Sequence, residues 1–163
     1  LILGAVILFR MMRNASVPPF WTYAYFMTMN LMALIAFAAL TIAAIQMRKK
    51  TQWHRRLMFC GMAALVVTPF NRLTPDAVLA QHMSLIPALA ILLFPLAGMV
   101  ADWLRDRRIH RAWLWGLGAL IVTGATTEIA GRSPLAGWMV AQITAGSAGA
   151  QIDPFVQHLP PPL

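Results

Sequence analysis

The stretch LMALIAFAALTIAAI, residues 31–45, contains no charged side chain. It forms the centre of a longer apolar segment that runs from about Phe26 to Met47. The hydrocarbon core of a bilayer is crossed by about 20 helical residues, so this segment is long enough to span it. The stretch therefore predicts a transmembrane helix and points to an all-α membrane fold.

The overall composition agrees with this interpretation. Of the 163 residues, 60% are hydrophobic and 11% are charged, whereas a soluble domain carries about 25% charged residues. The whole chain contains only five acidic residues, which are few for acid–base catalysis. There is no Gly-rich phosphate loop, no H-E-x-x-H motif and no recognisable serine nucleophile elbow. We therefore predict no catalytic residue and no metal site.

Four further apolar segments accompany this one, and we expect a polytopic transmembrane helix bundle with about four full spans. The first segment is too short to span alone, and we interpret it as part of a spanning helix whose start is missing. The bundle is expected within residues 1–131, with segments near 1–12 (partial), 26–47, 56–70, 82–103 and 113–130. Small residues in the last segment would let another helix approach closely: Gly116, Gly118, Ala119 and Gly124. Cys60 is the only cysteine, and its apolar surroundings predict a small core residue.

Residues 132–163 are predicted as an outer-face amphipathic helix followed by an extended tail. Ser133 and Pro134 predict an N-cap and the first residue of a helix. Apolar residues then recur at helical spacing: Leu135, Trp138, Met139 and Ile143. This pattern suits a helix that lies on the membrane surface, and a further full span is the weaker alternative.

Basic residues gather in two of the gaps between apolar segments. Nine of the thirteen Lys and Arg residues lie there: Arg48, Lys49, Lys50, Arg55, Arg56, Arg105, Arg107, Arg108 and Arg111. The positive-inside rule places both gaps on the cytoplasmic side, and the C-terminal tail on the outer, periplasmic side. Because the positive charge follows loops rather than one soluble face, we predict no nucleic-acid partner.

Aromatic residues flank two of the segments. Trp21, Tyr23, Tyr25 and Trp53 are predicted to anchor the helix ends at the headgroup level, where an apolar ring with a polar tip is best placed. For the Trp and Tyr residues before the second segment, a ligand box is the alternative. In the stretch WHRRLM, residues 53–58, Arg55 and Arg56 are interpreted as the charges that stop translocation.

Two motifs carry a resemblance to a known group of proteins. The run HRRLM, residues 54–58, precedes a segment that ends in Asn71-Arg72-Leu73, and a second block reads DWLRDRRIHRAWLWG at residues 102–116. These motifs resemble bacterial multi-pass inner-membrane proteins that carry an H-[KR]-R-L-M motif and a later arginine. The resemblance covers roughly residues 40–130. It implies a helical fold and the bacterial inner membrane, but no activity, since that family has none assigned.

The first candidate site pairs His54 with His110, each of which lies just before an apolar segment on the same side. Two histidines from different helices could hold a haem iron as axial ligands. The alternative is that each makes a hydrogen bond that fixes a loop, for example beside Asp102 or Asp106.

The second candidate site is an outer polar group of Arg72, His82, Glu128 and Arg132. Eighteen residues separate His110 from Glu128, or about 27 Å of helix, so this group is expected at the opposite face. Glu128 is the only acid of the 113–130 segment, and such a carboxylate needs a polar partner. We expect an arginine, a histidine or a polar ligand there, first of all Arg72. The group is either a salt bridge that ties helix ends together or a small pocket for a headgroup, a quinone or an anion.

The leading interpretation is a non-catalytic integral membrane protein, an accessory or structural subunit that packs against the helices of a larger complex. Its partners would be the lipid bilayer and other membrane-protein subunits. The first alternative is a membrane cofactor protein that binds haem or quinone for electron transfer. A third, weaker one is a small transporter, because Pro87 and Pro95 could break a helix.

Overall fold

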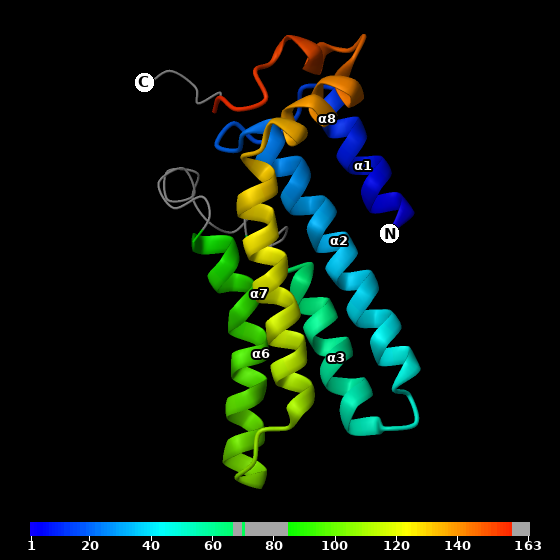
Figure 1. Cartoon of the computed structure of the whole chain (residues 1–163), viewed down its shortest axis with the longest axis vertical. Helices are drawn as coiled ribbons and strands as arrows, with labels where there is room; N and C mark the ends of the chain where they lie inside the picture. The colour runs from blue at the N-terminus through cyan, green and yellow to red at the C-terminus, as the bar shows by residue number, and fades with distance from the viewer. Residues whose placement is uncertain (67–69, 71–84, 158–163) are drawn as a thin grey trace.

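The computed structural model describes residues 1–66, 70 and 85–157, and within them the chain is all-helical, as predicted. Figure 1 shows the arrangement. The elements are α1 (Ile2–Arg13), α2 (Tyr23–Gln46), α3 (Thr51–Ala64), α6 (Leu85–Asp106), α7 (Arg111–Gly131), α8 (Pro134–Thr144) and the short 3-10 helix η1 (Ala148–Gln151).

Three helices of the described residues are long and apolar enough to cross a membrane: α2, the part of α6 from Ala88 onwards, and α7. The expectation of about four full spans is thus only partly met. The helix at the predicted 56–70 segment is α3, which begins earlier, at Thr51, and has 14 residues. At 1.5 Å per residue it extends about 21 Å, short of a hydrocarbon core of about 30 Å. The reason is that its first turns are built from the polar residues 51–56, which leaves too little apolar helix.

The helices form two antiparallel hairpins whose basic loops lie at the same end of the bundle, at the bottom of Figure 1. One hairpin joins α2 to α3 and the other joins α6 to α7. A core of small and apolar side chains holds α2, α3 and α7 together, with Ala44, Cys60 and Ala112 fully buried in it. The prediction that the two basic gaps share a side is consistent with this arrangement, and Cys60 is the core residue that its surroundings indicated.

Glycines permit two close approaches between these helices. A Cβ atom at Gly116 of α7 would overlap the Cys60 side chain of α3, and one at Gly98 of α6 would overlap the Trp113 ring of α7. Gly116 therefore does what the sequence predicted. At Gly118 and Gly124, in contrast, an added Cβ would meet no atom of the described residues within 4 Å. Pro95 lies inside α6, and the helix continues on both sides of it.

The opposite end of the bundle is an aromatic cluster covered by α1 and α8. The Trp21 and Tyr25 rings stack with centroids 5.3 Å apart, and their exposed fractions are 1% and 5%. Tyr23 is buried to the same degree. Protein covers the rings of these three residues, so they belong to the core at this end of the bundle. Their predicted position at the headgroup level stays a prediction.

The C-terminal region packs on this cluster more extensively than expected. Ser133 caps α8 as predicted, because its hydroxyl accepts from the Ala136 amide. Leu135 and Trp138 remain exposed, while the opposite face of α8 is buried against α1 and α2. Beyond α8, the Ala24 amide donates to the Pro154 carbonyl at 3.0 Å. The segment predicted as an extended tail therefore holds the start of α2 in place.

Candidate functional site

A three-helix polar clamp lies near the basic end of the bundle. Arg56 of α3 donates from Nε and Nη2 to the two oxygens of Asp102 on α6, each at 2.8 Å. The Trp113 indole of α7 donates to the same carboxylate at 2.8 Å. The side chains of Arg56 and Asp102 are 12% and 16% exposed. Because the pair is largely shielded from water, separating its partners would leave an uncompensated charge, so this clamp holds α3, α6 and α7 in place relative to each other.

Local sequence explains how the clamp forms. Arg56 follows Gln52 by one helical turn, and its Nη1 donates to both the backbone carbonyl and the side-chain oxygen of Gln52. Asp102 lies one turn before α6 ends, and Trp113 lies in the first turn of α7. Sequence reasoning treated Arg56 as a topology signal and overlooked its partners. Asp102 could have revealed the pair, because it is an acid at the end of an apolar segment. Such an acid needs a cationic partner, as Glu128 does.

His110 is the N-cap of α7. Its Nδ1 accepts a hydrogen bond from the Ala112 amide at 3.1 Å, and its ring meets the Trp53 ring edge-on at 5.5 Å. Burial, and after it the positive charge of Arg56, lowers the pKa of His110 below its ordinary value. An Nδ1 that accepts cannot also carry a proton, so the cap requires the neutral ring with its hydrogen on Nε2.

His54 has a different structural partner. Its Nδ1 lies 2.8 Å from the Ala44 carbonyl, in the last turn of α2. Because a carbonyl only accepts, this Nδ1 must be the protonated nitrogen. The two histidines proposed as haem ligands thus each use Nδ1 to hold a helix end, in line with the loop-fixing alternative. Among the described residues, no group of three or more His, Cys, Asp or Glu side chains could hold a metal ion. Haem ligation by the pair stays a prediction.

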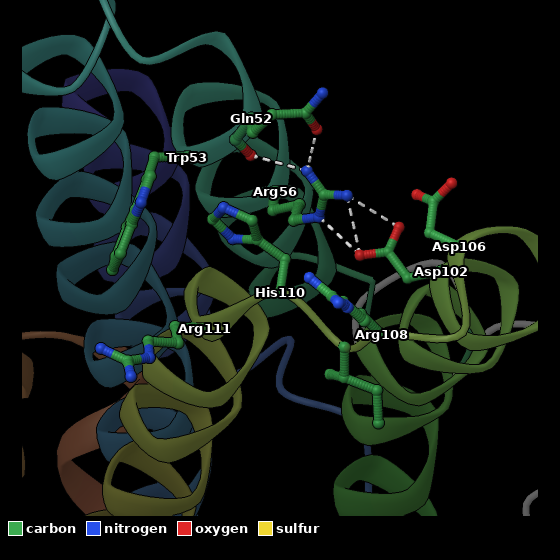
Figure 2. A pocket seen from close by; sticks show the side chains of 9 residues that line it. Gln52, Trp53, Arg56, Asp102, Asp106, Arg108, His110 and Arg111 are labelled. Carbon is green, nitrogen blue, oxygen red and sulfur yellow. Dashed lines mark hydrogen bonds and ion pairs between the residues drawn. The ribbon is translucent and has the colours of Figure 1, made fainter.

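A polar pocket of about 390 Å³ opens between the two basic loops, as Figure 2 shows. Three arginines and two acids line it, together with neutral His110. The complete lining is Gln52, Trp53, Arg56, Asp102, Asp106, Arg108, Ile109, His110 and Arg111. Its volume falls in the range of small-ligand sites, about 300–1,000 Å³.

An apolar groove of about 700 Å³ runs along the side of the bundle between α2 and α7. Its walls include Ala39, Ala43 and Ala119, with Leu57 of α3 behind them. Trp53 lines both this groove and the polar pocket, so the two cavities are neighbours. Trp53 is partly exposed, in agreement with the predicted position at the end of a helix, although it lies inside α3 rather than before it.

Glu128 has two partners near the other end of α7. Tyr25 of α2 donates its hydroxyl hydrogen to Oε1 at 2.6 Å, and Arg132 donates to Oε2 at 2.9 Å. The expected arginine partner is therefore present, but it is Arg132, one turn along the same chain segment. The first choice, Arg72, lies outside the described residues, as does His82. Sequence reasoning missed Tyr25 as a partner because it assigned that ring to the lipid interface.

No family model matches the chain, and neither a curated protein nor a solved structure matches it. The resemblance noted in the motifs at residues 54–58 and 102–116 accordingly stays a prediction. The function must be argued from the geometry of the helices and their polar groups.

Proposed function

We propose that this chain is a non-catalytic integral membrane protein, an accessory or structural subunit whose helices pack against those of a larger membrane complex. The state of its polar groups supports a structural role. The Asp102 carboxylate is saturated by Arg56 and Trp113, and the Glu128 carboxylate by Tyr25 and Arg132. Groups that hold each other in this way fix helices relative to one another.

The observation that carries the proposal is an apolar seam on the outer face of α6. Five large side chains follow the alternating spacing of four and three residues: Leu89, Leu93, Leu96, Val100 and Trp103. Their exposed fractions are 67, 59, 45, 55 and 48%, so the described residues leave them largely uncovered, although the Arg107 guanidinium lies 5.2 Å from the centre of the Trp103 ring. This is the heptad spacing with which two helices interlock side chains along a left-handed crossing.

A helix face that contacts only lipid would not require this heptad spacing. A lipid-facing surface needs only apolar residues, in any order, because acyl chains adapt to it. Regular spacing over four helical turns is instead what a facing helix recognises. The opposite face of α6 is occupied, since Gly98 meets Trp113 there. The occupant that fits the seam is an apolar spanning helix of a different membrane protein.

The same proposal includes an orientation in the bacterial inner membrane. The loops around Lys49 and Arg107 would face the cytoplasm, and α8 with the tail would lie on the periplasmic side. The charge asymmetry supports this orientation. Single cysteines introduced by Lys49→Cys and Ser147→Cys would test it, because Lys49 is exposed, Ser147 is partly exposed and native Cys60 is buried. An impermeant thiol reagent added to spheroplasts should label position 147 and spare position 49. The reverse pattern would contradict the orientation.

A matched pair of double variants tests the seam. The full chain is purified from its native membrane in a mild detergent, and co-purifying subunits are quantified. Leu93→Ala with Val100→Ala removes two seam residues seven apart, and we expect a roughly tenfold or larger loss of the partner. Leu114→Ala with Ile121→Ala makes the same change on exposed α7 residues outside the seam, and should retain it.

Three outcomes would overturn the structural assignment. One is equal loss in both double variants. Another is a particle that contains only copies of this chain. The third is a Soret band or a stoichiometric quinone in the wild-type preparation, which would favour the cofactor alternative.

A further inference from the structure

The polar pocket and the apolar groove border on the same side chain, because Trp53 belongs to the lining of both. A molecule that passes this ring would place a charged head in the pocket and an apolar chain in the groove. The pocket is at the end of the bundle, where the basic loops are, and the groove extends from it along α2 and α7 towards the middle of the helices. A molecule that fits this surface has a polar head at the helix ends and a long apolar chain beside them.

The charges in the pocket favour a negatively charged head. Arg56 and Asp102 neutralise each other. Asp106 lies 4.0 Å from Arg105 in an exposed pair, and it is the one acid that would oppose an anion. Arg108 and Arg111 have no ion-pair partner among the described residues. In Figure 2 the Arg111 guanidinium lies on the Trp53 side of the pocket and that of Arg108 on the Asp102 side.

His110, a neutral polar residue of the pocket lining, is also compatible with a bound anion. Neutral His110 keeps Nδ1 as the acceptor for the Ala112 amide, which leaves the hydrogen on Nε2 as a donor. Guanidinium groups bind phosphate oxygens through paired, charge-assisted hydrogen bonds. Basic pockets between spanning helices are known to take phospholipid headgroups. The ring of Trp53 marks the level between head and chain, where tryptophan is preferred in membranes.

We propose that this surface binds one anionic phospholipid. Its phosphate would lie between Arg108 and Arg111, and one acyl chain would fill the groove past Trp53, against Ala43 and Ala119. The site uses none of the seam residues on the outer face of α6, so it does not depend on the proposed subunit role. The lipid would act as a fixed part of the structure that bridges the two hairpins.

The test uses the full chain in dodecyl maltoside, stripped of lipid, with native mass spectrometry and thermal unfolding as readouts. The added probes are dioleoyl phosphatidylglycerol, dioleoyl phosphatidylcholine and inorganic phosphate. We expect one phosphatidylglycerol to bind at least about tenfold more tightly than phosphatidylcholine, because hydrogen bonds to charged groups account for such a factor. Inorganic phosphate, which lacks the chain, should not raise the melting temperature.

Two pairs of variants separate the head from the chain. Arg108→Gln with Arg111→Gln should abolish the preference for phosphatidylglycerol, whereas Arg48→Gln with Arg55→Gln removes the same charge outside the lining and should keep it. Ala119→Leu narrows the groove and should weaken both lipids. Its control is Ala125→Leu, at an exposed position of the same helix outside the lining.

Several results would overturn the site. Equal affinity for the two lipids would show that the site does not distinguish an anionic headgroup from a neutral one. Equal loss in the two arginine pairs would show a diffuse surface charge, and a response to inorganic phosphate that Ala119→Leu leaves unchanged would show a phosphate site without a lipid. If the Arg108 and Arg111 variant does not fold, the site is tested by comparing lipid binding to the Ala119→Leu and Ala125→Leu variants.

Discussion

Arg56 and Asp102 lie 46 positions apart in the sequence and form a bidentate ion pair in which both carboxylate oxygens accept at 2.8 Å. Trp113 donates to the same carboxylate, so one acid connects three helices. Neither Arg56 nor Asp102 therefore serves only to set the orientation of the chain in the membrane. The pair is mostly shielded from solvent, and this decides how each partner responds to substitution.

Asp102→Asn or Arg56→Gln should destabilise the bundle strongly. Each change leaves one charge shielded from water without its partner, at a cost of about 3–5 kcal/mol in a buried pair and less here, since both side chains keep some exposure. Unfolding in mixed detergent micelles measures the free energy. Arg105→Gln breaks only the exposed pair with Asp106 and should change stability by about 0–1 kcal/mol. Similar losses in the two cases would contradict the role of the clamp.

Gly98→Ala should loosen the α6–α7 hairpin. The added methyl group would overlap the Trp113 ring, and forcing an extra carbon into a packed contact costs about 1–3 kcal/mol. Gly118→Ala is the matched change at an open helical position, where alanine favours the helix by about 1 kcal/mol. Thermal unfolding should therefore shift in opposite directions, and a Gly98→Ala protein as stable as the wild type would show that the two helices are spaced differently.

Acidification should destabilise the basic end through His110. Its pKa is lower in the folded chain than the ordinary value of about 6.5, so between the two values the unfolded chain binds more protons. Stability is then fully present above about pH 6.5 and declines as the pH falls through that value. The melting temperature between pH 8 and pH 5 measures this. His110→Asn keeps a side chain that can cap a helix but does not titrate, so its pH dependence should be smaller than that of the wild type.

Tyr25→Phe should destabilise the opposite end by about 1 kcal/mol, because it removes the hydrogen bond to the partly buried Glu128 carboxylate. Arg132→Gln should cost less, at most about 0.5 kcal/mol, since that arginine is exposed and its pair spans a single helical turn. The order of the two losses, measured by chemical unfolding in detergent, is the result to check. A larger effect at Arg132 would mean that the ion pair dominates at Glu128.

Single-sequence reasoning located the elements that are governed by local composition. The uncharged run at residues 31–45 lies within α2, and the predicted 113–130 segment is α7 with small shifts at both ends. Ser133 capped the predicted helix because capping depends on residues a few positions apart. The start of α3 was placed too late because residues 51–55 were assigned to a loop, whereas they form the first turns of the helix.

The parts that sequence reasoning missed depend on contacts between distant segments. Tyr25 looks like any interfacial tyrosine until Glu128 is placed beside it, 103 residues further along the chain. Asp102 and Trp113 gave no local sign that they share Arg56. The tail after Thr144 has no apolar periodicity of its own, and it becomes ordered because Ile152 packs against the aromatic cluster and the Pro154 carbonyl accepts from the Ala24 amide.

The aromatic end of the bundle has a consequence for biogenesis. The ribosome delivers Phe20 and Tyr25 long before their partners, because the Gln157 amide that donates to the Phe20 carbonyl is made 137 residues later. During insertion, the start of α2 therefore passes into the membrane with its polar and aromatic groups still unmatched. The packing at that end of the molecule can be completed only after the last helix has emerged. Truncations near the C-terminus should therefore leave an inserted but incompletely assembled chain, which is the form that membrane quality-control proteases recognise.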